Sequence, residues 1–169
     1  MRAIIDNNLE VVKIFLEFDH NLAYIKDEKT GNTPFILAAE RGYVSIAKEI
    51  MSICPDSVYT PDKDGNSALN NAILSEKADF IDHILITPQL HRFINQGNNE
   101  GSLPLHLAAQ KCDPKLLRSL LAHARQDYTA VNVNNGNATN IVYGKTHLWK
   151  TLKWVSLLIF IALTHNTCL

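Results

Sequence analysis

The chain has little of what a catalytic or nucleic-acid-binding protein needs. Its 16 basic and 17 acidic residues give a net charge of −1. Without a basic stripe to attract phosphate backbones, we expect no nucleic-acid partner. The sequence also lacks a Gly-x-Ser-x-Gly elbow and a His-Glu-x-x-His zinc motif. We therefore expect a protein that is not an enzyme, with no cofactor and no metal site.

Cysteines are few and widely separated. The three residues, Cys54, Cys112 and Cys168, show neither the pairing of a zinc site nor the density of a disulfide framework. Charged residues interrupt positions 1–18, so no secretory signal is visible there. An odd number of cysteines without such a signal indicates a reducing compartment, and we expect a cytoplasmic location.

No apolar run in the sequence is as long as the roughly 20 residues that a membrane-spanning helix needs. The most apolar stretch, the run that contains Val155 to Leu163, would span roughly 15 Å as a helix, about half of the ~30 Å hydrocarbon core. Trp149 and three lysines lie beside it, a combination that also suits an interfacial anchor at the cytosolic face of a membrane. Residues 141–169 are thus a divergent apolar tail. It is interpreted as a cap or frayed end, as membrane association through residues 148–163, or as a short span.

Glycine is also scarce, yet four of the seven glycines are regularly spaced. Gly31, Gly65, Gly101 and Gly136 are 34, 36 and 35 residues apart, and each opens a similar block. A fixed period in this range is typical of repeat arrays. The pattern predicts an all-α solenoid of stacked helix-turn-helix units over residues 1–140. Units start near 31, 65 and 101, with partial units at both ends and a foldable centre at 30–125.

Helix-start signals follow each glycine in phase. Thr33 and Ser67 are good N-caps, because a side-chain oxygen can accept a hydrogen bond from an otherwise unpaired amide. Pro34 and Pro104 follow at the first helical position, where a missing N–H has no effect. Paired small residues, such as those at 38–39 and 108–109, allow the next helix to approach closely.

A second helix is predicted in every unit. Its apolar residues recur at i, i+3 and i+4, which indicates a buried face. Gly42 should end the first helix in a left-handed conformation. Of the residues at the same position in the other units, only Asn7 suits that geometry; Glu76 and Cys112 do not.

These blocks resemble the ankyrin repeat. Residues 31–36 contain its Thr-Pro pair, and residues 101–106 contain its Pro-Leu-His sequence. The resemblance implies short β-fingers between units and a structural, hydrogen-bonding role for His106. It also implies protein partners that bind the fingertips and the adjoining faces of the first helices.

Residues 1–140 further resemble the plant ankyrin–transmembrane proteins linked to defence and cell-death control. Residues 8–16, 37–42 and 54–59 carry this resemblance. It implies a setting in plant stress or defence signalling. Because the pattern stops after Gly136 while members of that family continue, a truncated product is one interpretation of this chain.

Candidate binding residues lie in the predicted fingers. They are polar, rich in turn formers and slightly acidic as a set. The residues are Lys26, Asp27, Glu28, Lys29, Asp62, Lys63, Asp64, Asn98, Asn99 and Glu100. Two functions fit: a non-catalytic interaction scaffold that binds a protein partner through fingers and concave face, or the regulatory arm of a membrane-anchored signalling or transport protein.

Overall fold

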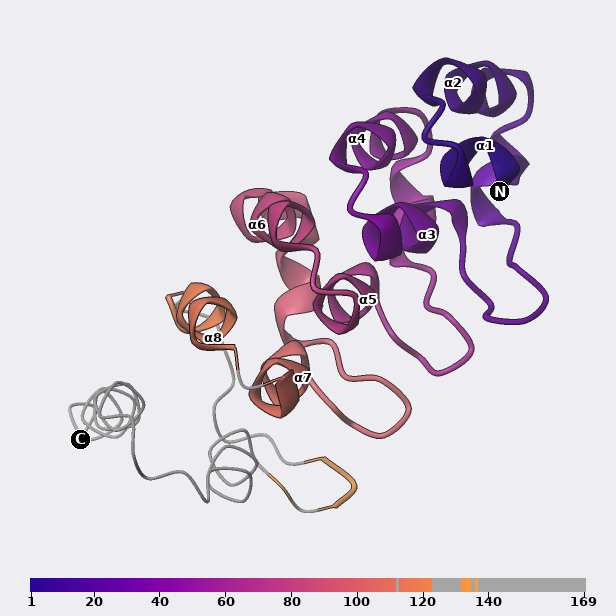
Figure 1. The fold of residues 1–169 in the computed structure, drawn as a ribbon. Helices are drawn as coiled ribbons and strands as arrows, with labels where there is room; N and C mark the ends of the chain where they lie inside the picture. Colours follow the sequence, from indigo (N-terminus) through magenta and orange to yellow (C-terminus); the bar gives the residue numbers. More distant parts are fainter. Residues whose placement is uncertain (112, 123–131, 135, 137–169) are drawn as a thin grey trace.

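The computed structural model describes residues 1–111, 113–122, 132–134 and 136 (Figure 1). Helices are the regular elements of this part of the chain, which contains no β-strand. The prediction of an all-α solenoid is confirmed, whereas the tail at 141–169 lies outside the described residues. In order the elements are α1 (Arg2–Ile5), α2 (Leu9–Phe18), η1 (His20–Tyr24), α3 (Pro34–Arg41), α4 (Val44–Ile53), η2 (Pro55–Tyr59), α5 (Ala68–Leu74), α6 (Ala78–Ile86), η3 (Pro88–Asn95), α7 (Pro104–Lys111) and α8 (Pro114–Leu121).

The helices form two rows. Figure 1 shows α1, α3, α5 and α7 in an inner row and α2, α4, α6 and α8 in an outer row, with loops projecting beyond the inner row. Contacts run along each row, from α3 to α5 to α7 and from α2 to α4 to α6. Each helix pair therefore packs mainly on the pairs before and after it, as stacked repeats do.

The predicted caps start the inner helices. Thr33 Oγ1 accepts a hydrogen bond from the Ile36 amide at 3.4 Å, and Ser67 Oγ accepts one from the Asn70 amide at 3.3 Å. Leu103 has no such oxygen. Its own N–H instead donates to His106 Nδ1 at 2.9 Å, which confirms a structural hydrogen bond for this histidine.

The first helices end in a left-handed residue. Gly42 has φ of +79°, as predicted, and Asn7 has φ of +51°. Glu76 also adopts this conformation, at φ of +57°, although its side chain does not favour it. The turn between paired helices therefore overrides the local preference of Glu76. Cys112, at the same position in the next unit, lies outside the described residues.

The core lies between the two rows and between successive units. Ala38, Ala39 and Ala108 are fully buried, which confirms that small residues allow close packing of the inner helices. Phe35 of one unit meets Phe80 of the next edge to face, with ring centroids 6.0 Å apart. Burying each such ring contributes about 1.5–3 kcal/mol, so these contacts join the units into one cooperative body.

One core position carries an unsatisfied polar side chain. Ile36, Asn70 and His106 occupy the same place in three successive units, and Ile36 and Asn70 are fully buried. Neither the Oδ1 nor the Nδ2 of Asn70 has a hydrogen-bond partner in the described part of the chain. A buried amide without partners destabilises the folded state.

Replacing Asn70 with isoleucine should therefore stabilise the protein. We expect Asn70→Ile to raise the free energy of unfolding by about 1–2 kcal/mol, because the desolvation penalty of the amide is removed. Urea unfolding followed by circular dichroism measures the change. The reverse exchange, Ile36→Asn, is the matched control and should lower stability by about 2 kcal/mol or more. A destabilised Asn70→Ile would show that the amide has a partner in solution.

Candidate functional site

The fingers line one edge of the stack beside the inner helices (Figure 1). We call this edge the rim and define it as residues 26–32, 60–66 and 96–102. One backbone hydrogen bond closes each finger at its base. The donor and acceptor pairs are Asp27 N to Asn32 O at 2.9 Å, Asp62 N to Asn66 O at 3.1 Å, and Asn98 N to Ser102 O at 3.1 Å. The first loop thus contains one residue more than the other two.

The first residue of each loop holds the loop together. Asp27 Oδ1 accepts hydrogen bonds from the amides of Lys29 and Thr30 and from the Thr30 hydroxyl. The hydrogen bonds from Thr30 keep the pKa of Asp27 below its usual value. Asn98 Oδ1 similarly accepts from two amides, at 3.0 and 2.9 Å. These side chains shape the fingers from within.

Asp62 plays the same part and is 9% exposed. Its carboxylate accepts four hydrogen bonds, from the Asp64 amide at 2.9 Å, from the amide and side chain of Asn66 at 2.7 and 3.1 Å, and from the Asn71 side chain at 3.0 Å. With its lone pairs occupied inside the protein, Asp62 belongs to the framework. Asp62 was also predicted as a partner-binding finger residue, and that contact stays a prediction.

The fourth finger shows a difference in register. Asn132 N donates to Gly136 O at 3.2 Å, and Asn132 Oδ1 accepts from the Gly136 amide at 3.1 Å. Asn132 therefore matches Asp62 and Asn98, and Gly136 matches Asn66 and Ser102. Gly136 therefore stands one position later in its loop than Gly31, Gly65 and Gly101 stand in theirs, although it follows Gly101 at the expected interval. The intervals between glycines do not show where each loop closes.

Hydrogen bonds also join neighbouring fingers. The amides of Lys63, Asn99 and Val133 donate to the carbonyls of Thr30, Asp64 and Glu100, at 3.2, 2.9 and 2.9 Å. Gly31 and Gly65 make this approach possible: a Cβ on either would lie 2.8 Å from the backbone nitrogen of the next finger. Both also have φ near +75°, at +74° and +77°. Gly31 and Gly65 thus have a structural role, because a side chain at either position would collide with the next finger and would strain the backbone.

The rim lysines lie across the fingers. Lys26 Nζ donates to the carbonyl of Pro61 at 2.8 Å, and Lys63 Nζ donates to the carbonyls of Glu28 and of Lys29, the latter at 3.0 Å. Asn99 Nδ2 similarly donates to the Lys63 carbonyl at 3.0 Å. These three predicted contact residues therefore help to fasten each finger to the next.

Three carboxylates are left facing solvent. Glu28, Asp64 and Glu100 are exposed, one on each finger, and none has an ion pair or side-chain hydrogen bond among the described residues. Lys29 is exposed beside them. Lys26 and Lys63 are exposed as well and keep their positive charges beside the carbonyl groups that they contact. The rim therefore carries charges of both signs, with the carboxylates in slight excess.

The inner helices add residues that the finger motif does not reveal. Nine residues after each glycine lie Glu40, Leu74 and Gln110, near the end of α3, α5 and α7. Glu40 accepts a hydrogen bond from Asn32 Nδ2 at 2.8 Å, which places it at the base of the first finger. Leu74 is 40% exposed. The same glycine period, extended by nine residues, could have identified this row.

A metal site and a membrane-spanning helix are both absent from the part of the chain that the structure describes. The described residues contain no group of three His, Cys, Asp or Glu side chains placed to hold a metal ion. None of their helices has the length and apolar character needed to cross a membrane. The predicted membrane-associating segment at 148–163 lies outside these residues.

Known proteins share this repeat. Residues 1–48 match the family model described as ankyrin repeats (many copies). Over these residues, which run from α1 into α4, the chain is similar to ankyrin repeats. A protein of Arabidopsis thaliana described as "Putative E3 ubiquitin-protein ligase XBAT31" is 27% identical over 128 residues, which cover 70% of this chain. This chain spans 28% of that relative's length.

The two aspartates of the second finger should behave differently when truncated. We expect Asp62→Ala to lower the free energy of unfolding by about 2 kcal/mol, because four donors lose their acceptor. Asp64→Ala, the matched control, should change it by less than about 0.5 kcal/mol. Thermal and urea unfolding of both variants measure the difference. Equal effects would contradict the assignment of Asp62 to the framework.

Proposed function

We propose that this protein is a non-catalytic scaffold that binds a protein partner through the rim and the adjoining inner helices. The observation that carries the proposal is the row of solvent-facing carboxylates at Glu28, Asp64 and Glu100, fixed on fingers that are hydrogen-bonded to one another. A stacked array offers an extended surface for such a contact. The partner surface that fits it carries basic side chains.

Rigidity favours this surface over an ordinary set of charged loops. Each finger is closed at its base and joined to the next, so little conformational freedom is lost when a partner binds. Exposed charges at an interface mainly raise the rate and specificity of association. Leu74 holds the position in α5 that Glu40 holds in α3, and its 40% exposed side chain adds apolar area to the inner row.

Reversing the three charges should weaken partner binding selectively. We expect the combined variant Glu28→Lys, Asp64→Lys and Glu100→Lys to bind roughly tenfold or more weakly, since each exposed pair contributes a fraction of a kcal/mol and its reversal adds repulsion. Partners recovered from plant cell extract by cross-linking are quantified by mass spectrometry. Binding of each recovered partner is then measured at two salt concentrations.

The matched control reverses three exposed carboxylates away from the rim. Glu17→Lys, Asp56→Lys and Asp82→Lys change the net charge equally and lie on α2, η2 and α6. Partners should be kept by this variant. Equal losses in both variants, or losses in neither, would contradict binding at the rim.

We also propose a setting for this scaffold: the cytoplasm of plant cells, in stress or defence signalling. The resemblance to plant ankyrin–transmembrane proteins and the Arabidopsis relative support the plant setting. A second candidate is an interaction arm attached to a membrane. The tryptophans and lysines ahead of the apolar stretch at 155–163 favour it.

Membrane fractionation separates these two candidates. If the tail is an anchor, residues 1–169 should stay in the membrane pellet after an alkaline carbonate wash, and a chain ending at residue 140 should not. The physical reason is burial of apolar side chains, which carbonate does not reverse. Recovery of both chains in the supernatant would contradict the membrane-arm candidate.

A further inference from the structure

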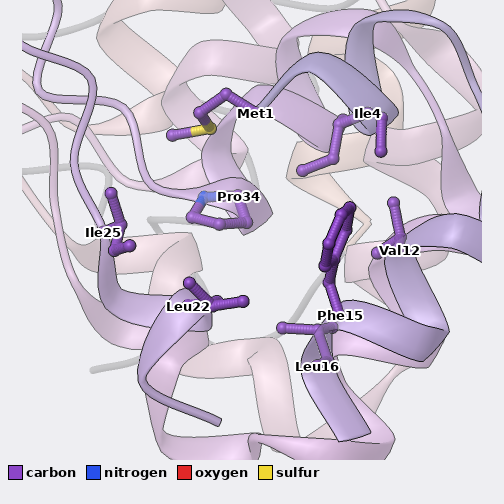
Figure 2. Close-up of a pocket in the computed structure, with 9 residues that line it drawn as sticks. Met1, Ile4, Val12, Phe15, Leu16, Leu22, Ile25 and Pro34 are labelled. Carbon is purple, nitrogen blue, oxygen red and sulfur yellow. The ribbon is translucent and has the colours of Figure 1, made fainter. Parts of the chain in front are cut away.

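A histidine is buried in the outer row of helices, where the third unit (α5 and α6) packs on the second (α3 and α4). This residue, His83 of α6, is 8% exposed. The outer helix of the first unit buries apolar side chains, and Figure 2 shows Val12 and Leu16 of α2 among their apolar neighbours. In α6, which packs on α4, a titratable ring is buried as well.

Hydrogen bonds determine which ring nitrogen of His83 carries the proton. Thr87 Oγ1 donates its hydrogen to the His83 carbonyl at 2.6 Å. Toward His83 Nδ1, 3.4 Å away, the same oxygen can therefore only accept, so Nδ1 is the protonated nitrogen of the neutral ring. Nε2 keeps its lone pair. It is buried and has no hydrogen-bond partner in the described part of the chain.

A second proton on this ring is therefore unfavourable in the folded protein. It would bind at Nε2, and the new N–H would have neither water nor an acceptor to pair with. Burial accordingly lowers the pKa of His83 below its usual value, and repulsion from Lys48 of α4 lowers it further.

No carboxylate forms an ion pair with the His83 ring in the part of the chain that the structure describes. The elements packed against α6 are α4, α5, η3 and α8, and α3 reaches it through Phe35. Of the charged groups on these elements, Lys48 acts on the ring, and it opposes protonation. The other titratable or charged side chains on them and on α6 itself are Glu40, Arg41, Glu49, Asp79, Asp82, His91, Arg92, Lys115 and Arg118.

We propose that His83 makes the joint between the second and third units sensitive to acid, so that protonation of its ring loosens α6 from α4. The unfolded chain takes up this proton more readily than the folded chain. Stability therefore falls as the pH drops below about 6.5, where a free histidine titrates. The second finger, residues 60–66, connects the same two units. An effect of the joint on partner binding rests on the proposed function, whereas the acid sensitivity itself does not.

Thermal unfolding of residues 1–169 at pH 7.5 and pH 5.5 tests the joint. We expect the melting temperature of the parent chain to fall by at least about 3 °C more than that of His83→Leu, because the variant has no ring to protonate. Hydrogen-exchange protection in α6 should fall at least about threefold more in the parent chain than in the variant. His20→Leu is the matched control: His20 is exposed, and its replacement should leave both differences unchanged.

NMR of the His83 ring separates titration from a packing effect of the substitution. In the folded parent chain the ring should titrate at a lower pH than free histidine. The midpoint should rise in Lys48→Met, which keeps most of the apolar stem of Lys48 and removes its charge.

Two results would overturn the proposal. The first is the same pH dependence of melting temperature or protection in the parent chain and in His83→Leu. The second is a His83 ring that titrates at or above the midpoint of free histidine. Because the ring is measured in the parent chain, the second result decides the matter even if His83→Leu does not fold.

Discussion

Close approach between successive units is the constraint on which this structure depends. No helix pair can bury all of its apolar surface by itself, so much of the core lies between neighbouring units. Alanines at 38, 39 and 108 bring the inner helices together. Glycines at 31 and 65 bring the fingers together at the same spacing. The helices and the fingers must therefore have the same spacing from one unit to the next. The repeating sequence determines that spacing for both.

This shared spacing also determines which polar residues remain for recognition. The amides, carbonyls and lysines that join one finger to the next occupy most of the polar groups of the rim. Asp27, Asp62 and Asn98 shape the loops. Among the residues left over, Asp64 and Glu100 stand at the same place in two successive fingers, whereas Thr30 holds that place in the first finger, where the exposed carboxylate is Glu28.

Sequence reasoning succeeded where a residue acts alone or through its neighbours in the chain. The N-caps at Thr33 and Ser67, the helix-starting prolines and the left-handed Gly42 are local features, and all were predicted. Features that depend on tertiary contacts could not be predicted from the sequence. Asp62 and Asp64 are the same residue type and lie two positions apart in one loop, yet only the fold shows that Asn66 and Asn71 donate hydrogen bonds to Asp62. Glu76 is left-handed because the paired helices require it there.

The unequal lengths of the fingers have a consequence for how such a protein changes over time. The first loop accommodates an extra residue between Asp27 and Asn32, and Thr30 still meets the next finger as Asp64 and Glu100 do. Insertions and deletions at a fingertip are thus absorbed locally, without shifting the helices behind it. Binding specificity can diverge among related chains through the loops, while the residues that hold the stack together stay under separate selection.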